Sequence, residues 1–253
     1  MAQAVPVRVR RSAPYLARKH AAKSLTIRPV IGGHALIESS DAASPPLLST
    51  DNSLIFSDGI WVDANTDTGL DYSDGESQER ELRRILSDAP DRRWDAAGLA
   101  RNHNDWALEY HLSPVRANIL RGLALKNRKT VLEVGAGCGA ITRYLGDQGF
   151  RVDAVEGSTA RAQLAALRCQ GLDDVSLVRA NINDLTLPAA TYDLVLFVGV
   201  LEYAARFWGD DSSAETAVKK MLSQAVASLT PGGVILVAIE NRIGAKYLCG
   251  FSE

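Results

Sequence analysis

The stretch Thr130-Val-Leu-Glu-Val-Gly-Ala-Gly-Cys-Gly-Ala-Ile-Thr142 decides the fold of this chain. It opens with an apolar run, Val131 to Val134, which is typical of a buried parallel strand. Glycines follow at every second position, Gly135, Gly137 and Gly139, and a helical apolar pattern begins directly after them. Because glycine lacks a Cβ atom, the backbone can turn sharply there and a ligand can lie against the main chain. A strand, a glycine turn and a helix form the ligand-binding corner of a doubly wound α/β sheet.

The rest of the C-terminal half continues this alternation of strands and helices. Apolar runs predict strands over residues 150–156, 175–179, 192–198 and 234–239, and helical patterns predict helices over 158–170 and 213–229. Strands separated by helix-length segments pair in parallel through right-handed crossovers. The predicted fold class is therefore α/β, with a Rossmann-like, doubly wound parallel sheet.

The composition excludes several classes of protein. The 253 residues are 46% hydrophobic and carry a net charge of −2, which allows a sizeable core and gives no overall attraction to nucleic acid or membranes. No apolar stretch approaches the roughly 18–20 residues of a membrane span, and no signal peptide is visible. The three cysteines, Cys138, Cys169 and Cys249, are scattered and lack metal-ligand spacing, so we expect no metal site. An odd, scattered set also gives no disulfide framework, which fits a reducing cytoplasm.

Charge is distributed unevenly over the N-terminal third. The first 30 residues carry seven basic side chains and no acid, whereas residues 38–79 carry only acids. The favoured interpretation is a solvated tail that folds against the acidic stretch. The alternative is an arm for nucleic acid, for a membrane surface or for organelle import.

Helical patterns precede the glycine stretch, and a hairpin pattern precedes the helices. The pair Asp58-Gly59 between two apolar runs predicts a β-hairpin over residues 53–62. We expect a helix from Gln78, a second over residues 97–111, and a third with Ser113-Pro114 as its N-cap and first residue. The apolar face predicted for the third helix consists of Val115, Ile119, Leu120 and Leu123.

Two kinds of adenosine cofactor are compatible with the glycine stretch. Gly135-x-Gly137-x-x-Ala140 fits a dinucleotide fingerprint, and Glu156 ends the next strand about 20 residues on, where an acid bonds a ribose diol. Both features also suit S-adenosylmethionine. Glu133, inside the first strand, favours a cofactor with a positive amino group over one with a pyrophosphate. The competing interpretation is an NAD(P)-linked oxidoreductase. The sequence lacks the catalytic Tyr-x-x-x-Lys pair of such enzymes, because the residue four positions after Tyr144 is Gln148.

Over residues 130–239 the sequence resembles the class I S-adenosylmethionine-dependent methyltransferases. The matching pieces come in the order of that family and are together far more specific than the glycine loop alone. They are Val131-Leu-Glu-Val-Gly-Ala-Gly-Cys-Gly139, Val155-Glu156-Gly157, Asn181-Ile182-Asn183-Asp184, Tyr192-Asp-Leu-Val-Leu-Phe197 and Leu229-Thr-Pro-Gly-Gly233.

This resemblance implies a set of cofactor-binding residues. The glycine stretch would line the methionine part, Glu156 would hold the ribose hydroxyls, and Asn181 and Ile182 would flank the adenine. Many members carry aspartate where Asn181 stands, but an amide can also pair with the adenine edge. The full predicted set is Glu133, Gly135, Ala136, Gly137, Gly139, Glu156, Gly157, Asn181, Ile182 and Gly199.

A narrower resemblance concerns the acceptor of the methyl group. Residues 109–121, 197–203 and 239–250 resemble methyltransferase modules attached to glycosyltransferases in bacterial surface-polysaccharide assembly. This implies a sugar hydroxyl or another glycan-linked acceptor, with a glycosyltransferase as partner or as a C-terminal continuation. An alcohol acceptor gains from a general base, and strand ends and neighbouring helices offer three catalytic candidates, Glu202, Glu240 and His111.

Three regions are predicted along the chain: residues 1–76 as an N-terminal extension with the hairpin, 77–128 as a helical lead-in, and 129–253 as the cofactor-binding α/β domain. The last region offers five strands, whereas the resemblance implies seven. We therefore expect a fragment of a longer chain whose apolar fifth strand associates with other chains. The alternatives are that the N-terminal hairpin covers that edge, or that the chain is an inactive binding or interaction module.

Overall fold

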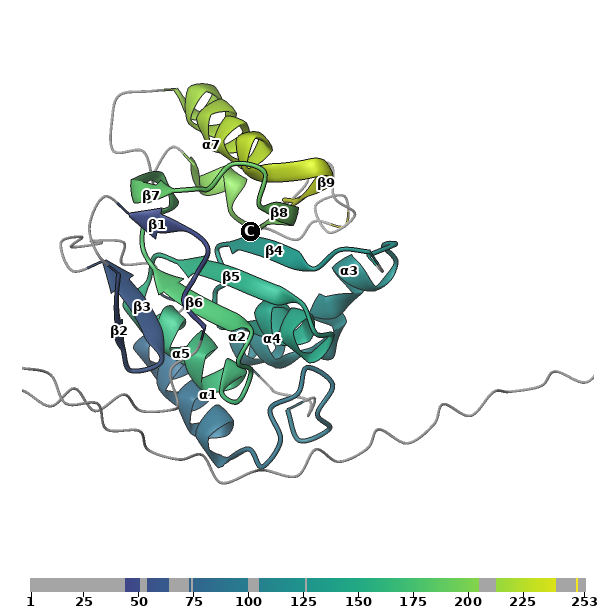
Figure 1. Cartoon of the computed structure of the whole chain (residues 1–253). Coiled ribbons are helices and arrows are strands. Elements are labelled where there is room, and N and C mark those ends of the chain that lie inside the picture. Colours follow the sequence, from purple (N-terminus) through teal and green to yellow (C-terminus); the bar gives the residue numbers. More distant parts are fainter. Residues whose placement is uncertain are drawn as a thin grey trace, which may run out of the picture. The chain divides into compact units, whose positions relative to one another are not determined.

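A seven-stranded, mostly parallel β-sheet organises the structure (Figure 1). The computed structural model describes residues 44–50, 54–63, 73, 75–99, 105–125, 127–204, 213–239 and 249. The basic N-terminal block, part of the acidic one and the catalytic candidate Glu240 lie outside these residues. None of the helices in the described part of the chain is both long and apolar enough to cross a bilayer.

The strand order of the sheet identifies a doubly wound fold. In spatial order the strands are β2 (Leu54–Ser57), β3 (Ile60–Asp63), β6 (Val175–Arg179), β5 (Arg151–Glu156), β4 (Thr130–Val134), β8 (Tyr192–Val198) and β9 (Leu229–Ala238). All neighbours pair in parallel except β2 and β3. The chain runs outward from β4 to β6 and then returns to the other side of β4, so its winding reverses between β4 and β8. The predicted Rossmann-like fold is confirmed.

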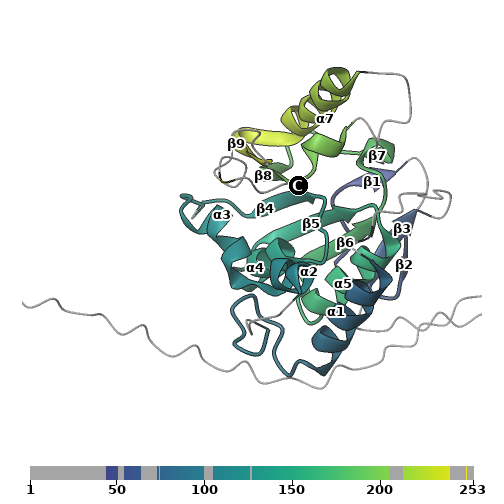
Figure 2. The ribbon, with the colours of Figure 1, turned by 180° about the vertical axis from the view of Figure 1, so that it is seen from behind.

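Helices cover both faces of the sheet, as the two opposite views show (Figures 1 and 2). One face is covered by α4 (Ala140–Asp147) and α5 (Thr159–Cys169), and the other by α7 (Ala214–Ser228). Val131 of β4 packs with α4 and α5, whereas its neighbour Leu132 packs with α7. Because successive side chains of a strand point to opposite faces, a strand covered on both faces requires a continuous apolar run.

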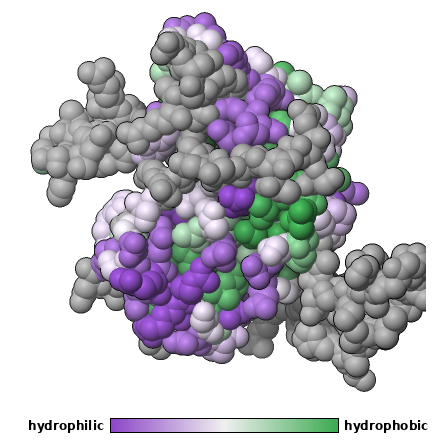
Figure 3. All heavy atoms as spheres, turned by 90° about the vertical axis from the view of Figure 1, so that its left-hand side faces the viewer, coloured by the Kyte–Doolittle hydropathy of each residue, from purple (hydrophilic) through white to green (hydrophobic). Residues whose placement is uncertain are grey.

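The predicted helix from Gln78 is confirmed as α1 (Glu76–Asp88), which packs on α5. Leu82 and Leu86 of α1 are buried against Leu164 of α5. Most of the charged residues of α1 are exposed, namely Glu76, Arg80, Arg83, Arg84 and Asp88. The face shown in Figure 3, the left-hand side of Figure 1, is largely hydrophilic and gathers its apolar side chains in a limited area. By packing on α5, α1 of the lead-in adds a third helix to the layer formed by α4 and α5.

The two helices predicted between α1 and β4 differ from expectation. The helix expected over 97–111 begins only at Trp106, as α2 (Trp106–Leu112), because the side chain of Asp105 caps it by accepting from the N–H of Leu108. The next one opens as a 3₁₀ turn, η1 (Pro114–Ala117), and continues as α3 (Asn118–Arg121). Of its predicted apolar face only Leu120 is buried, while the other three members, Val115, Ile119 and Leu123, are exposed. Periodicity groups side chains on one face but does not show whether another element covers that face.

The predicted β-hairpin is confirmed, and it occupies the edge of the sheet opposite to β9. β2 and β3 pair antiparallel around Asp58 and Gly59, whose φ angles of 52° and 80° are those that a tight hairpin turn requires. β3 then pairs in parallel with β6. The alternative that this hairpin covers the fifth strand of the α/β domain is therefore wrong, because its pairing partner is the third strand.

β9 forms the other edge, and no strand among the described residues pairs with its outer side. It begins at Leu229, five residues before the predicted start at Val234, so Pro231-Gly232-Gly233 lies inside it. The register of its pairing with β8 shifts at this point, between Tyr192 and Leu194. The side chains of Val234 and Val237 are 38% and 44% exposed.

We expect the protein to self-associate through β9, because an apolar edge strand offers unpaired backbone groups to another chain. Val237→Lys places a charge on this edge and should lower the associated fraction in light scattering. Leu123→Lys adds the same charge at another exposed apolar site, on the segment just after α3, and should leave association unchanged. A wild-type protein that is monomeric at every concentration would contradict this expectation.

A buried carboxylate ties the segment before β1 (Ser49–Thr50) to the sheet. Asp153 of β5 is 1% exposed, and its Oδ2 accepts from the N–H groups of Leu47 and Leu48 at 2.7 and 3.4 Å and from the Tyr192 hydroxyl at 2.7 Å. Burial raises the pKa of Asp153, and these hydrogen bonds offset part of that effect. β1 itself pairs with β7 (Leu185–Thr186) in a small separate sheet.

Asp153→Ala is expected to lower the free energy of unfolding by about 2–4 kcal/mol, because three donors lose their common acceptor. Tyr192→Phe removes only one of these donors and should cost about 1–2 kcal/mol. Urea denaturation of both variants measures the difference. A larger loss for Tyr192→Phe than for Asp153→Ala would show that Asp153 is not the centre of this network.

Candidate active site

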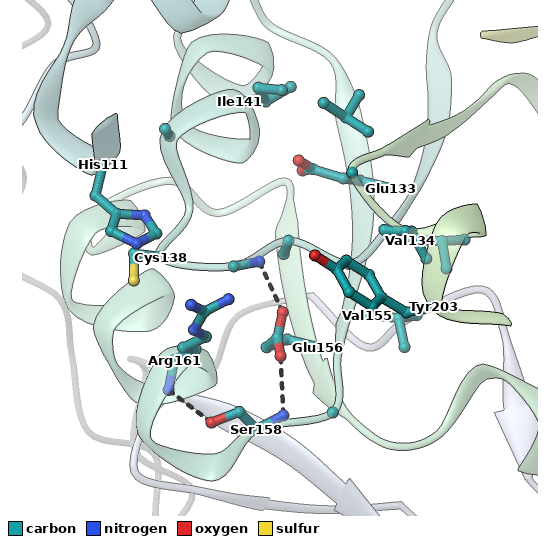
Figure 4. A pocket seen from close by; sticks show the side chains of 18 of the residues that line it. His111, Glu133, Val134, Cys138, Ile141, Val155, Glu156, Ser158, Arg161 and Tyr203 are labelled. Carbon is teal, nitrogen blue, oxygen red and sulfur yellow. Dashed lines mark hydrogen bonds between the residues drawn. The ribbon is translucent and has the colours of Figure 1, made fainter. Parts of the chain in front are cut away.

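A cavity of about 590 Å³ opens at the carboxyl ends of the central strands (Figure 4). Its walls come from the loops after β4, β5, β6 and β8, where the winding of the sheet reverses, which is the usual ligand position in such folds. The cavity brings together nine of the ten residues predicted to bind a cofactor. These are Glu133, Gly135, Ala136, Gly137, Glu156, Gly157, Asn181, Ile182 and Gly199.

Two glycines of the β4–α4 loop line the cavity for different reasons, although both have positive φ angles. A Cβ atom on Gly135 would overlap the side chain of Val200. A Cβ atom on Gly137 would meet no heavy atom within 4 Å. Gly137 therefore leaves open space at the cavity wall, where a ligand can approach the backbone.

Gly139, the tenth predicted residue, does not line this cavity. A Cβ atom at this position would lie 2.9 Å from the Cα atom of Ala165 in α5. Glycine is therefore needed here for close packing of α4 on α5. The regular spacing of the three glycines did not distinguish this packing role from contact with a cofactor.

Glu156 ends β5 and connects the glycine loop to the start of α5. Its Oε2 accepts from the N–H of Gly137 at 2.7 Å, and its Oε1 accepts from the N–H of Ser158 at 2.8 Å (Figure 4). The hydroxyl of Ser158 in turn caps α5 by accepting from the N–H of Arg161. Glu156 is 8% exposed and lines the cavity, where a carboxylate can accept from ribose hydroxyls.

Glu133 of β4 supplies a second acid to the cavity, and it is only 2% exposed. One carboxyl oxygen accepts from the hydroxyl of Thr142 at 2.6 Å. Burial raises the pKa of Glu133 to about 8, and the Thr142 hydrogen bond and the positive charge of Arg116 offset only part of that rise. A cationic group of a ligand would stabilise the charged form of this carboxyl.

Asn181 and Ile182 line the cavity just after β6, the strand next to β5. The side-chain oxygen of Asn181 accepts from the N–H of Asn183 at 3.1 Å and so caps the 3₁₀ turn η2 (Ile182–Asp184). Ile182 is 7% exposed. An amide beside an apolar side chain is a suitable surface for a planar base.

Two of the three predicted catalytic residues, His111 and Glu202, line the cavity. His111, in α2, is 6% exposed, and its ring makes an edge contact with the ring of Tyr110. Glu202 is exposed in the 3₁₀ turn η3 (Leu201–Tyr203), which follows β8. The third candidate, Glu240, is not among the described residues.

The cavity also contains residues that the sequence analysis did not assign. Trp106 and Arg116 come from α2 and η1, and Arg161 comes from the first turn of α5. The side chain of Arg161 points toward the cavity beside Glu156 (Figure 4). No spacing in the sequence links Trp106 and Arg116 to the glycine loop, because the lead-in that contains them reaches the cavity only through tertiary packing.

The fold and the cavity together define a Rossmann-like domain that suits an adenosine cofactor. Comparison with known proteins indicates the family of this domain. Residues 132–237 match a family model described as a methyltransferase domain. The chain is 25% identical over 155 residues to a ubiquinone biosynthesis O-methyltransferase of Rickettsia prowazekii, covering 60% of this chain and 55% of that protein. It is 30% identical over 131 residues to a protein-L-isoaspartate O-methyltransferase of Methylorubrum populi, covering 50% and 57%.

Solved structures give matches of the same extent. The PH0226 protein from Pyrococcus horikoshii OT3 has a TM-score of 0.42 and 22% identity, covering 55% of this chain and 57% of that one. The chain spans about half the length of the curated relatives it matches. Residues 132–237 thus match a methyltransferase domain, and the cofactor of such a domain is S-adenosylmethionine.

The residues of the cavity fit this cofactor. S-adenosylmethionine carries a positive sulfonium and an amino group at one end and a ribose diol with adenine at the other. Glu133 offers a buried carboxyl to positive charge, and Glu156 offers acceptors to hydroxyls. The open space over Gly137 lets a ligand lie directly against the loop between these two acids.

Glu156→Ala is expected to weaken the binding of S-adenosylmethionine by about 1.5–3 kcal/mol, the usual cost of losing hydrogen bonds to a charged group. The variant also loses the acceptor that holds the N–H of Gly137 in the loop. Glu156→Gln keeps one acceptor oxygen and should lose less affinity. Calorimetry measures both, and unchanged affinity in a folded Glu156→Ala protein would make Glu156 only a loop carboxylate.

Proposed function

We propose that the protein transfers the methyl group of S-adenosylmethionine to an oxygen atom of a small-molecule acceptor. The observation that carries this proposal is one cavity at the strand ends, lined by the glycine loop, by Glu133 and by Glu156. The two acids suit the two ends of the cofactor. Oxygen is proposed as the accepting atom because two relatives are named as O-methyltransferases.

The bound cofactor supplies a methyl group on a sulfonium, which is a good leaving group, so the protein mainly positions the reactants. Glu156 and the Gly137 backbone would orient the ribose of the cofactor, and Glu133 would orient its amino-acid part. Apolar residues of the cavity wall, such as Val134 and Val155, exclude water from the part of the cavity between Glu133 and Glu156. Orientation and desolvation of this kind are the main contributions a protein can make to such a displacement.

His111 is our proposal for the base that takes the proton of an acceptor hydroxyl, with Glu202 as the second candidate. Both line the cavity, but His111 is the more buried. The buried guanidinium of Arg168 donates to the backbone carbonyl of His111 at 2.5 Å, which fixes the end of α2 against α5. His111→Gln should therefore lower kcat and leave cofactor affinity unchanged.

Several classes of oxygen acceptor are candidates for this protein. The narrower sequence resemblance implies a sugar or glycan-linked hydroxyl, and a glycosyltransferase as partner. Relatives named for ubiquinone biosynthesis and for protein L-isoaspartate make other oxygen acceptors equally open to test. We also propose a cytoplasmic location, because Cys138 and Cys169 are buried thiols that form no disulfide, as expected in a reducing compartment.

Calorimetry with S-adenosylmethionine, S-adenosylhomocysteine and NADH tests the cofactor. Label transfer from methyl-labelled S-adenosylmethionine to catechols, sugars and carboxylates then tests the reaction. Cofactor binding with label on an oxygen supports the proposal. NADH binding without S-adenosylmethionine binding would instead indicate an oxidoreductase, and cofactor binding without transfer to any acceptor would indicate an inactive module.

A further inference from the structure

A second groove, of about 390 Å³, lies on α2 and η1 beside the cofactor cavity. It shares three lining residues with that cavity, Trp106, Tyr110 and Arg116. Val115 and Ile119 are among the residues that line only the groove. Because the two spaces share these residues, the groove lies directly beside the cofactor cavity, with these three side chains at the boundary.

The groove adjoins the cavity on the side of Glu133. Arg116 stands in the common wall, and its positive charge acts on the Glu133 carboxyl. In the proposed function, on which this inference rests, Glu133 faces the methionine part of the cofactor. On this placement the groove adjoins the end of the cofactor that carries the methyl group, and Glu156 lies at the other end.

Large apolar side chains are exposed along this groove. Trp106 is 74% exposed, Val115 65% and Ile119 38%. Val115 and Ile119 are four residues apart in a helical segment, so their side chains form one stripe. Contiguous apolar groups in water are unfavourable, and such patches mark binding sites.

The aromatic part of the groove is ordered by contacts between its own side chains. The rings of Trp106 and Tyr110 stack with centroids 5.1 Å apart and an angle of 22° between their planes. The guanidinium of Arg116 lies 3.9 Å from the centre of the Tyr110 ring. These contacts hold Trp106 as a flat and largely exposed platform, which suits stacking of a planar ring without loss of side-chain freedom on binding.

We propose that this groove is the acceptor subsite and that the acceptor is a hydroxylated aromatic ring carrying an apolar chain. The ring stacks on Trp106, and the chain lies along Val115 and Ile119. The exposed surface of the lining is mainly apolar, with Glu109 and Ser113 as further polar members, whereas a sugar would need several side-chain partners for its hydroxyls. In the transfer, the acceptor oxygen gains the methyl group and loses its proton to a base of the chain, while sulfur keeps the electron pair of the broken bond.

Calorimetry of a 4-alkylcatechol series against the full chain, loaded with S-adenosylhomocysteine, tests this proposal. In the wild type the affinity should increase with chain length, by up to about fourfold for each buried methylene. Val115→Asp and Ile119→Asp should remove that dependence and leave S-adenosylhomocysteine affinity unchanged. Trp106→Ala should weaken unsubstituted catechol as well, by about two- to tenfold.

The control variant is Leu123→Asp, since Leu123 is another exposed apolar side chain of the same region, at 43%, but lies outside the groove. It should keep the wild-type chain-length dependence. Loss of that dependence in Leu123→Asp, or its absence in the wild type, would overturn the subsite. Alkyl glucosides with the same chains, used below their micelle concentrations, test the ring: affinity equal to that of the catechols would overturn an aromatic acceptor.

Two further outcomes are kept separate from these. If S-adenosylhomocysteine does not bind, the proposed function fails, and the catechol series on the unloaded chain still tests the groove by itself. If light scattering shows a wild-type dimer that Val115→Asp converts to a monomer, the groove binds a second copy of the chain and the acceptor proposal is overturned.

Discussion

Replacing Gly137 with valine is expected to abolish the binding of S-adenosylmethionine while the protein stays folded. The site of the new Cβ atom has no heavy atom within 4 Å beyond the neighbouring residues of the chain, so the Cβ atom itself does not clash with the fold. It stands instead at the cavity wall and fills the space over the loop that the cofactor needs. We expect at least about 3 kcal/mol of lost affinity, the upper range for overfilling a well-packed site.

The control for this variant is Gly171→Val. Gly171 has a φ angle of 86°, against 55° for Gly137, and a Cβ atom there also meets no heavy atom within 4 Å, but Gly171 does not line the cavity. Both variants should lose about 1–2 kcal/mol of stability from the left-handed backbone. Only Gly137→Val should lose the cofactor in calorimetry. Normal binding by Gly137→Val would mean that the cofactor does not lie on this loop.

The second large effect expected is proton-linked binding of the cofactor through Glu133. The buried carboxyl, with its pKa raised to about 8, is largely protonated at neutral pH, and a cationic cofactor should convert it to the carboxylate. Binding then releases a proton, and the affinity contributed by Glu133 should rise with pH by up to about tenfold per unit until pH 8. Because the amino group of the cofactor also titrates, the quantity to measure is the difference between wild type and Glu133→Gln. A constant difference from pH 5.5 to 8.5 would rule out this linkage.

The same carboxyl makes the stability of the cofactor-free protein depend on pH. Its pKa in the folded state is raised above the ordinary value of 4.5, so its contribution is fully present below about pH 4.5 and is lost as pH rises through 8. Between these limits the wild type should become less stable relative to Glu133→Gln, by roughly 3–5 kcal/mol at most. Urea denaturation at pH 5 and pH 8 measures this change, and its sign is opposite to that of an ion-paired carboxylate.

The cofactor half of the site could be predicted because its residues come from strand ends that the sequence marks clearly. The apolar run up to Val134, the glycines after it and Glu156 at the next strand end follow a fixed order along the chain. Parallel strands bring these ends to one edge of the sheet whatever the details of packing. The exception is Gly139, whose contact is with Ala165, a residue that no local pattern connects to it.

The acceptor half could not be predicted in the same way. Val115, Ile119 and Leu123 have the spacing of a buried helix face, yet all three are exposed. Trp106 and Arg116 gave no signal at all, although both line the cavity. Helical spacing shows that side chains share a face, but whether that face meets the core, a ligand or water depends on elements far away in the sequence.

The sequence by itself determined the doubly wound sheet and its ligand-binding edge, because both depend on local patterns, namely apolar runs and glycines without Cβ atoms. Glu133 and the family resemblance indicated the type of cofactor. The tertiary structure alone decided which edge receives the N-terminal hairpin, where α2 and η1 meet the cavity, and which carboxyl is buried deeply enough to hold a proton near neutral pH. These features depend on contacts between residues distant in the chain and on the exclusion of water around them. No short pattern of residue types shows which distant residues make contact or how completely water is excluded around them.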